Sequence, residues 1–362
     1  MSMLAAATPA YTGLEIFWFL VIALLWVGYF VLEGFDFGVG ILLPILGRTE
    51  TDRRVMVNTI GPVWDGNEVW LLVAGGATFA AFPEWYATLF SGFYLALLLI
   101  LLALIARGVA FEYRGKVDSP RWRAGWDQAI FWGSAVPALL WGVAFANIVH
   151  GVPINAHKEY TGTLLTLLNP YGLLGGVVTL GLFTLHGAYY LGLKSEGDVR
   201  ERANAVVRRL APVVVVAGAV FLVWTQIDSG RPLSWATTVL AALVLVASVL
   251  ASLRGREGWA FALMAGCLGL VVITLFATLY PHVMVSSTSP LFSLTTTNAS
   301  SGHYTLMVMT WVAAVMTPFV LIYQTWTYWV FRARVGPGHI PVPLVPRRPT
   351  AVRPAASGAG RA

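Results

Sequence analysis

Four carboxylates and one arginine stand where apolar stretches of this sequence begin or end, and they are the residues best suited to proton chemistry. Glu33 and Asp36 are three residues apart near the end of the first apolar stretch, and Asp65 and Glu68 are three apart at the start of the second. A spacing of three puts each pair on one face of a helix. Arg107 ends the third stretch. Burial raises the pKa of a carboxylate and a nearby guanidinium lowers it. The pKa of an acid in such a cluster can therefore be adjusted so that it relays protons.

Two interpretations of these acids compete. Acids near apolar segments are costly to bury and usually functional, but at helix ends they are also commonly solvated or paired with arginine. For Glu33 and Glu68 the structural interpretation is the stronger one. We favour proton relay for Asp65 and Asp36, because Asp65 lies in the sequence Trp-Asp-Gly-Asn at 64–67, where Asn67 can hydrogen-bond a carboxylate.

The elements that must position these residues are membrane-spanning helices. Hydrophobic residues make up 57% of the 362 residues, charged residues 11%, and the mean hydropathy is +0.73. A soluble domain carries about 25% charged residues, and a membrane helix needs about 20 mostly apolar ones. Without the period-two alternation of a barrel, the sequence predicts an all-α integral membrane protein. The nine predicted helices are Leu14 to Phe35, Pro62 to Ala81, Tyr86 to Ile105, Ala129 to Ile148, Tyr171 to Leu191, Ala211 to Trp224, Leu233 to Leu250, Trp259 to Tyr280, and Leu306 to Trp329.

Two of these helices have uncertain ends. The first stretch stays mostly apolar to Leu46, which predicts a tilted helix or an inner helical extension. The sixth is short and can extend back through Val206.

The basic residues predict the orientation. With the N-terminus outside, 21 of the 23 lysines and arginines fall on the cytoplasmic side, and only Lys158 and Arg231 fall outside. Cytoplasmic loops carry the excess of lysine and arginine in membrane proteins, so the split favours both nine helices and a cytoplasmic C-terminus. Because these charges lie beside lipid headgroups, the net charge of +6 does not indicate nucleic-acid binding.

The same topology brings the acids together. The first and third helices end, and the second begins, at a similar cytoplasmic depth, so the four carboxylates and Arg107 are expected to gather there. Glycines are expected to bring helices close around them. Gly34 and Gly38 have the four-residue spacing of close helix packing, and Gly66 adjoins Asp65.

The chain is a poor candidate for binding haem or a metal. Haem held between helices usually needs two facing ligands, and of the six histidines only His186 falls within a predicted helix. The single cysteine, Cys267, excludes an internal disulfide. We expect a transmembrane domain over residues 1–334 and a disordered cytoplasmic tail, rich in proline and arginine, over 335–362.

Several long motifs resemble subunit II of the cytochrome bd-type quinol oxidases. In order along the chain they are GFDFGVG (34–40), GPVWDGNEVWLL (61–72), FSGFYLALLLILLALIARGVAFEYRGK (90–116), RWRAGWDQAIFWGS (121–134), GVAFANIVHGVP (142–153), LLNPYGLLGGV (167–177) and the region 281–301. The resemblance covers residues 14–331, and the Trp-Asp-Gly-Asn motif is its strongest single element.

The resemblance implies a subunit of a bacterial cytoplasmic-membrane enzyme that oxidises quinol, reduces O2 to water and builds a proton gradient without pumping. Haems of b and d type are bound by subunit I, the partner of this subunit, and small accessory subunits can join the pair. Subunit II is implied to fold as two four-helix bundles plus one helix. The aspartate matching Asp65 is tied to a proton channel toward the haems, with the residues matching Asp36 and Arg107 near that route.

Departures from the family and two alternatives remain. Glu68 replaces glutamine of some relatives, and His186 replaces an uncharged residue.

A proton-coupled secondary transporter could use the same acids, but it would predict helix ends meeting at mid-membrane. A purely structural subunit, whose acids only lock it to a partner, is the other alternative.

Overall fold

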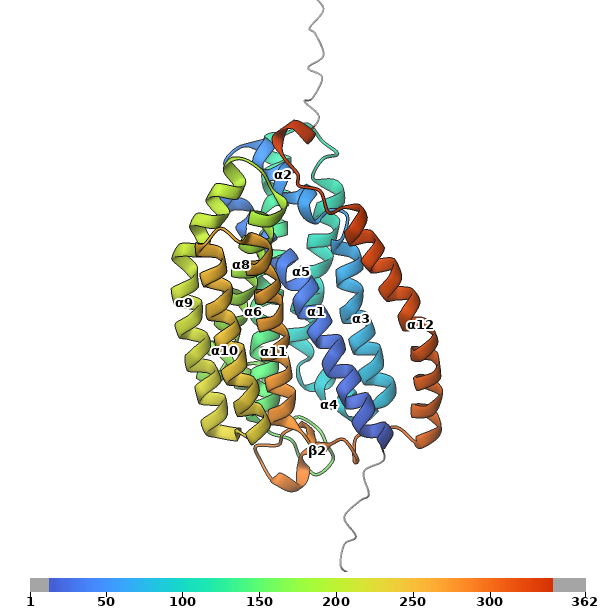
Figure 1. The fold of residues 1–362 in the computed structure, drawn as a ribbon. Coiled ribbons are helices and arrows are strands. Elements are labelled where there is room, and N and C mark those ends of the chain that lie inside the picture. Colours follow the sequence, from blue (N-terminus) through green and yellow to red (C-terminus); the bar gives the residue numbers. More distant parts are fainter. Residues whose placement is uncertain (1–12, 341–362) are drawn as a thin grey trace, which may run out of the picture.

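The computed structural model describes residues 13–340, which form an all-α membrane protein with one small β-ribbon (Figure 1). The helices before the ribbon are α1 (Gly13–Leu46), α2 (Glu50–Ile60), α3 (Trp64–Ala81), α4 (Pro83–Gly92), α5 (Tyr94–Tyr113), α6 (Pro120–His150), α7 (Leu164–Leu167), α8 (Pro170–Lys194), α9 (Asp198–Ser229), α10 (Pro232–Leu253) and α11 (Glu257–Leu279). Then follow β1 (His282–Met284), the 3-10 turn η1 (Pro290–Phe292), β2 (Leu294–Thr295), α12 (His303–Val330) and the 3-10 turn η2 (Pro337–His339). Strands β1 and β2 pair antiparallel.

Eight helices in the described residues are long and apolar enough to cross a membrane: α1, α5, α6 and α8 to α12. The second predicted helix forms as α3, but it is not apolar enough to be counted among these eight. Asp65, Asn67 and Glu68 in its first two turns reduce its hydropathy. Polar residues are therefore concentrated at one end of α3, where it packs against α1.

Several predicted helix bounds can be compared with the structure, and α6 begins at Pro120, nine residues before the predicted Ala129. Helix α1 runs unbroken to Leu46, as the apolar extension suggested. The third predicted helix is divided at Phe93 into α4 and α5, beside Gly92, which packs so closely on Tyr160 that an added Cβ would lie 2.6 Å from the Tyr160 Cβ. Helix α5 then continues to Tyr113, so Arg107 lies within the helix and not at its end. Helix α9 begins at Asp198, earlier than predicted.

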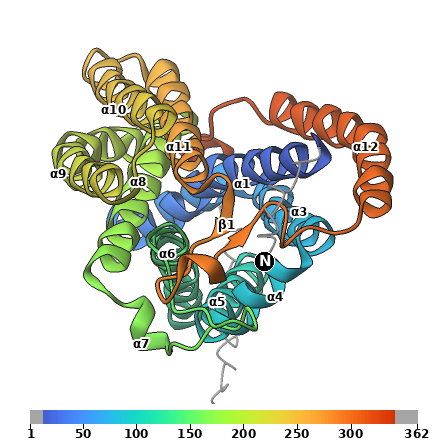
Figure 2. The same ribbon diagram turned by 90° about the horizontal axis from the view of Figure 1, so that it is seen from below.

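The long helices pack as two groups with α12 at the edge. Helices α8, α9, α10 and α11 contact one another in a ring, while α1, α3, α5 and α6 form the neighbouring group. Helices α1 and α6 join the two groups, because both pack on α8 and α1 also packs on α11. Figure 2 shows α12 set apart beside α1 and α3, and Leu306 is the only buried residue in the range His303–Val330.

Gly38 is where α1 and α8 come closest. A Cβ added to Gly38 would collide with the Phe183 carbonyl oxygen and lie 2.7 Å from the Gly187 Cα. Gly34 lies one turn earlier on α1, and a Cβ added there would lie 2.8 Å from the Phe183 ring. The small-residue spacing predicted from the sequence thus lies at a helix contact, where van der Waals packing holds membrane helices together.

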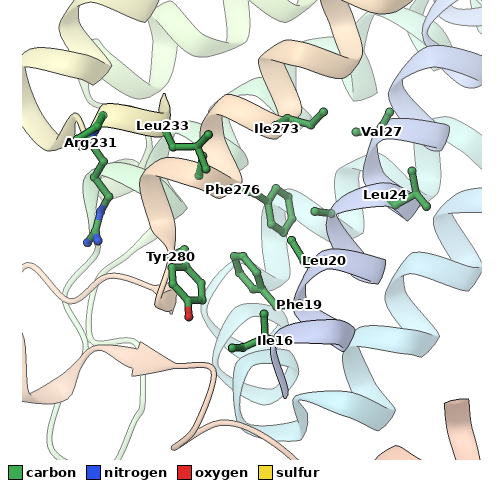
Figure 3. A pocket seen from close by; sticks show the side chains of 13 residues that line it. Ile16, Phe19, Leu20, Leu24, Val27, Arg231, Leu233, Ile273, Phe276 and Tyr280 are labelled. Atoms are coloured by element: carbon green, nitrogen blue, oxygen red, sulfur yellow. The ribbon is translucent and has the colours of Figure 1, made fainter. Parts of the chain in front are cut away.

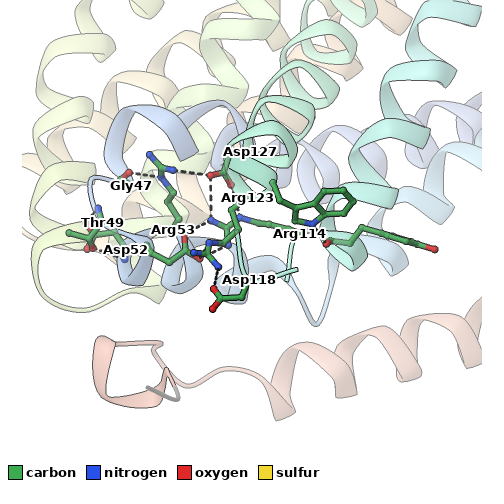
Figure 4. A network of polar contacts seen from close by, with 11 residues as sticks. Gly47, Thr49, Asp52, Arg53, Arg114, Asp118, Arg123 and Asp127 are labelled. Carbon is green, nitrogen blue, oxygen red and sulfur yellow. Dashed lines mark hydrogen bonds and ion pairs between the residues drawn. The ribbon is translucent and has the colours of Figure 1, made fainter. Parts of the chain in front are cut away.

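The end of the molecule that carries α2, the α5–α6 and α8–α9 links and the end of α12 is here called the basic end. Charged side chains tie its elements together (Figure 4). The Asp127 carboxylate on α6 accepts hydrogen bonds from Arg53 at 3.0 Å and from Arg114 at 2.6 Å, and Arg114 also binds Glu50 at 2.8 Å. These ion pairs join α2 to the ends of α5 and α6.

Asp52 completes the capping box of α2, in which Thr49 is the N-cap residue, and its ionisation is expected to affect stability. The Thr49 N–H donates to its carboxylate at 3.0 Å, and Arg202 on α9 forms an ion pair with it at 2.9 Å. Burial alone would raise the pKa of Asp52, but these contacts outweigh burial and lower the pKa.

A group whose folded-state pKa is lowered contributes stability above its unfolded pKa of about 4, and that contribution is lost as the pH falls through the folded value. We therefore expect Asp52→Asn to reduce stability by about 1 kcal/mol at pH 7. The difference should disappear in the most acidic samples of a thermal-unfolding series in detergent. The variant Asp118→Asn, at an exposed position, serves as the control. If the stability lost in Asp52→Asn were the same at low pH as at pH 7, this role of Asp52 would be contradicted.

The chain beyond α12 returns across the basic end. The Val335 N–H donates to the Lys194 carbonyl at 2.8 Å, Arg334 pairs with Glu257 at 3.0 Å, and Ile340 is buried. The segment predicted as a tail from Val335 is thus packed against the helices as far as Ile340. The remainder of that predicted tail, 341–362, lies outside the described residues.

Candidate functional site

The strongest polar feature inside the helices is an ion-pair cluster around Arg107. The guanidinium donates from Nη1 to Glu33 on α1, and both side chains are fully buried. Glu68 on α3 lies 3.3 Å from the same nitrogen and is 22% exposed. The rings of Phe37 and Phe111 have their centroids 4.8 and 5.4 Å from the Arg107 Cζ. One cation therefore joins acids from two helices in an apolar setting.

Close packing of α5 on α6 places Arg107 there. A Cβ added to Gly133 on α6 would lie 2.6 Å from the Arg107 Cβ. Gly133 thus lets the two helices approach at this level, and the long arginine side chain leads into the space between α1 and α3.

Asp36 is held by a separate contact, in which Asn67 is central. Asn67 Nδ2 donates to Asp36 Oδ2 at 2.7 Å and to the Leu32 carbonyl at 3.3 Å. Asn67 Oδ1 accepts from the Tyr328 hydroxyl at 2.8 Å and from Gln324 Nε2 at 3.3 Å. All four hydrogen-bonding positions of this amide are used, so α12 takes part in the site through Tyr328 and Gln324.

The buried part of the site retains hydrogen-bonding capacity. Glu33 Oε2, Asp36 Oδ1, and Nε and Nη2 of Arg107 are buried and have no hydrogen-bond partner among the described residues. Buried polar groups normally find a partner in protein or water. Three carboxylates facing one guanidinium, with these atoms free, can bind protons and water.

The cluster differs from the predicted one in a single member. Glu33, Asp36, Glu68 and Arg107 come together, but Asp65 is exposed in this chain at the first turn of α3. Asp65 shares the helix face of Glu68 by spacing. A Cβ added to Gly66 would meet nothing within 4 Å, so the close contact expected at Gly66 is not found within the described chain.

Sequence reasoning identified Asn67 as a carboxylate partner but missed Tyr328 and Gln324. These two residues lie 261 and 257 positions from Asn67 along the chain. Their i, i+4 spacing on an otherwise apolar helix is the sequence signal that could have found them.

His186 is unsuited to ligate haem iron. Its Nε2 lies 3.1 Å from the Val31 carbonyl oxygen, and its ring stacks on Phe261 at 4.7 Å between centroids. Its Nδ1 is buried and has no hydrogen-bond partner within residues 13–340. The described residues contain no group of three or more His, Cys, Asp or Glu side chains that could hold a metal ion. The Nε2 atom of His186 is thus already engaged with the Val31 carbonyl oxygen.

An apolar groove of about 730 Å³ lies far from this cluster, at the opposite end of the molecule (Figure 3). Helices α1, α10 and α11 line it with side chains such as Phe19, Leu24 and Phe276, and Arg231 and Tyr280 stand at its edge. It contains none of the predicted site residues. The polar chemistry of the chain therefore lies in the buried cluster and not in this groove.

Known proteins resemble this chain over most of its length. The family of cytochrome bd terminal oxidase subunit II matches residues 14–331. Cytochrome bd ubiquinol oxidase subunit 2 of Bacillus subtilis (strain 168) is 44% identical over 324 residues, which cover 88% of this chain and 96% of that protein. Cytochrome bd-I ubiquinol oxidase subunit 2 of Escherichia coli (strain K12) is 39% identical, covering 90% and 96%.

A solved structure shows the same fold. A chain in the structure of bd oxidase from Geobacillus thermodenitrificans superposes with a TM-score of 0.70, at 17% identity, covering 88% of this chain and 99% of that one.

Proposed function

This chain belongs to the family of cytochrome bd terminal oxidase subunit II and is a multi-pass bacterial membrane subunit of a ubiquinol oxidase, and from that premise we propose that it supplies the enzyme with protons from the cytoplasm. Protons enter at Asp65, pass Glu68 and reach the buried cluster of Glu33, Asp36 and Arg107. From there they continue to the oxygen-reducing haems of the partner subunit. The observation that carries the proposal is the buried cluster. Helix packing alone would not need three acids around one arginine, nor buried polar atoms that have no partner in residues 13–340.

The proposed topology has nine membrane helices, namely α3 and the eight apolar ones, with the N-terminus outside and the C-terminus in the cytoplasm. It is supported by the basic end, which carries the arginines of α2 and of the α5–α6 link, whereas Lys158 lies in the link between α6 and α7 and Arg231 just before α10. The two helix groups correspond to two four-helix bundles, and α12 is the additional helix. The basic end is then the cytoplasmic one, in the bacterial cytoplasmic membrane.

Asp65 is proposed as the entrance because it is exposed at the cytoplasmic end of α3 while Glu68 lies on the same face one turn deeper. Glu68 in turn is 3.3 Å from Arg107. Arg107 attracts the negative charge of the neighbouring carboxylates, which opposes the effect of burial, and orients water between them. Protons can pass between these neighbouring carboxylates without a rearrangement of the helices.

The chemistry with oxygen is assigned to the partner. Haems of b and d type supply electron transfer and O2 reduction when bound to subunit I, and quinol is oxidised there. Support comes from His186, the one histidine within a predicted helix, because its Nε2 already contacts the Val31 carbonyl oxygen. The enzyme would release quinol protons outside and take up cytoplasmic protons through this chain, which creates a gradient without pumping.

Replacing the entrance residue tests the pathway. In the complex purified with mild detergent, we expect Asp65→Asn to lower quinol oxidase turnover by about tenfold or more, because a relay step loses its proton-binding group. The partner subunit and the reduced-minus-oxidised haem spectrum should be retained, and the haem bands should leave with the partner when it is stripped. Asp118→Asn, an exposed change at the same end, is the control.

A purely structural subunit is the alternative, and the buried Glu33–Arg107 ion pair is the observation in its favour. That role predicts full turnover in Asp65→Asn. It also predicts that loss of activity in any variant is matched by loss of assembled complex.

A further inference from the structure

Helix α12 packs on α1 and α3, and one set of its polar side chains leads to Asp36. Tyr328 and Gln324 lie one turn apart on α12 and face Asn67 and Trp70, which lie one turn apart on α3. In a helix with one buried residue, such contacts determine its position.

The orientation of each amide in this set is determined by a donor that cannot be reversed. The Trp70 indole can only donate, and it donates to Gln324 Oε1 at 2.8 Å. The Gln324 amide must therefore present Nε2 to Asn67. Asn67 must receive that donor on Oδ1, at 3.3 Å. Its own Nδ2 is then directed at Asp36 Oδ2, at 2.7 Å.

This orientation distinguishes the two oxygens of Asp36. Oδ2 accepts from Asn67 and so cannot present a proton to it, because Nδ2 has no acceptor capacity. Oδ1 is buried and has no partner among residues 13–340. A proton bound by Asp36 is thereby directed to Oδ1.

We propose that Trp70, Gln324 and Tyr328 are positioning residues that fix the Asn67 amide toward Asp36, so that Oδ1 of Asp36 is the oxygen that takes up and releases the proton. The inference rests on the proposed proton pathway. It adds that α12, although peripheral, sets the proton affinity of an acid on α1 through a chain of hydrogen bonds.

Infrared spectroscopy with turnover measurements tests the proposal on the purified oxidase. The carboxyl C=O band of Asp36 is assigned in the reduced-minus-oxidised spectrum by its loss in Asp36→Asn. In Tyr328→Phe and in Gln324→Leu we expect that band to shift, and the pH profile of turnover to move by about one unit, a tenfold change in proton affinity. Tyr323→Phe, on the same helix and 66% exposed, should leave both unchanged.

The outcomes separate this inference from the pathway itself. If Asp36→Asn lowers turnover but Tyr328→Phe and Gln324→Leu leave the band and the pH profile in place, positioning by α12 is wrong and the pathway stands. If Asp36→Asn and Asp65→Asn both turn over normally, the pathway fails and this inference with it. Tyr328→Phe removes one oxygen only, so it keeps the test open if Gln324→Leu does not assemble.

Discussion

The Arg107→Met complex is expected to be nearly absent from the membrane. Arg107 and Glu33 are both fully buried, and their ion pair is the only direct contact between the Glu33 carboxylate and a cation among the described residues. Removing one partner of a buried pair leaves the other charge uncompensated, at a cost of about 3–5 kcal/mol. Because whole proteins are stable by only about 5–15 kcal/mol, most of the complex should fail to assemble.

The amount of Arg107→Met is measured from the haem absorbance and partner subunit recovered per milligram of membrane. The double variant Glu33→Gln with Arg107→Gln is the matched control, because two neutral amides can hydrogen-bond each other. It should recover a large part of the assembled complex without recovering turnover. Normal assembly of Arg107→Met would contradict the burial of an ion pair at this site.

Gly38→Ala is expected to have the second-largest effect on assembly. The added methyl group would meet the Phe183 carbonyl and the Gly187 Cα, which belong to the backbone of α8 and cannot rotate away. Overpacking of this kind costs about 1–3 kcal/mol, and more where backbone must move. Since α1 joins the two helix groups, separation from α8 would also disturb Glu33 and Asp36.

Thermal unfolding in detergent measures the effect of Gly38→Ala, with Gly218→Ala on α9 as the matched control. A Cβ at Gly218 meets nothing within 4 Å, so that variant should unfold at the temperature of the unmodified complex. Equal stability of the two variants would show that α1 and α8 are not in the close contact described here.

Most of the fold could be predicted from hydropathy because the membrane imposes helices of defined length. The predicted helices correspond to helices in the structure, and most lysines and arginines of residues 13–340 fall at one end. Hydropathy does not indicate the break at Phe93, beside which Gly92 packs closely on Tyr160. Helix α5 continues past Arg107 through the apolar residues 108–111, which the predicted end at Ile105 left out.

The candidate site could be predicted from charge and spacing only in part. Glu33, Glu68 and Arg107 could be found because ionisable groups are rare in apolar stretches. The partner of Asp36 depends on which face of α3 meets α1, and the role of Tyr328 depends on where α12 docks, at a separation of 261 residues from Asn67. Neither is encoded in local periodicity. The exposure of Asp65 likewise follows from three-dimensional packing.

Proton uptake by the reconstituted oxidase tests the central claim most directly. In proteoliposomes with a pH-sensitive dye confined to one side, quinol oxidation by the unmodified complex should remove protons from the side that faces the basic end. We expect Asp65→Asn to slow this uptake by about tenfold or more while its haem spectrum is unchanged. Uptake at the unmodified rate, from the same side, in Asp65→Asn would contradict a proton pathway that begins at Asp65.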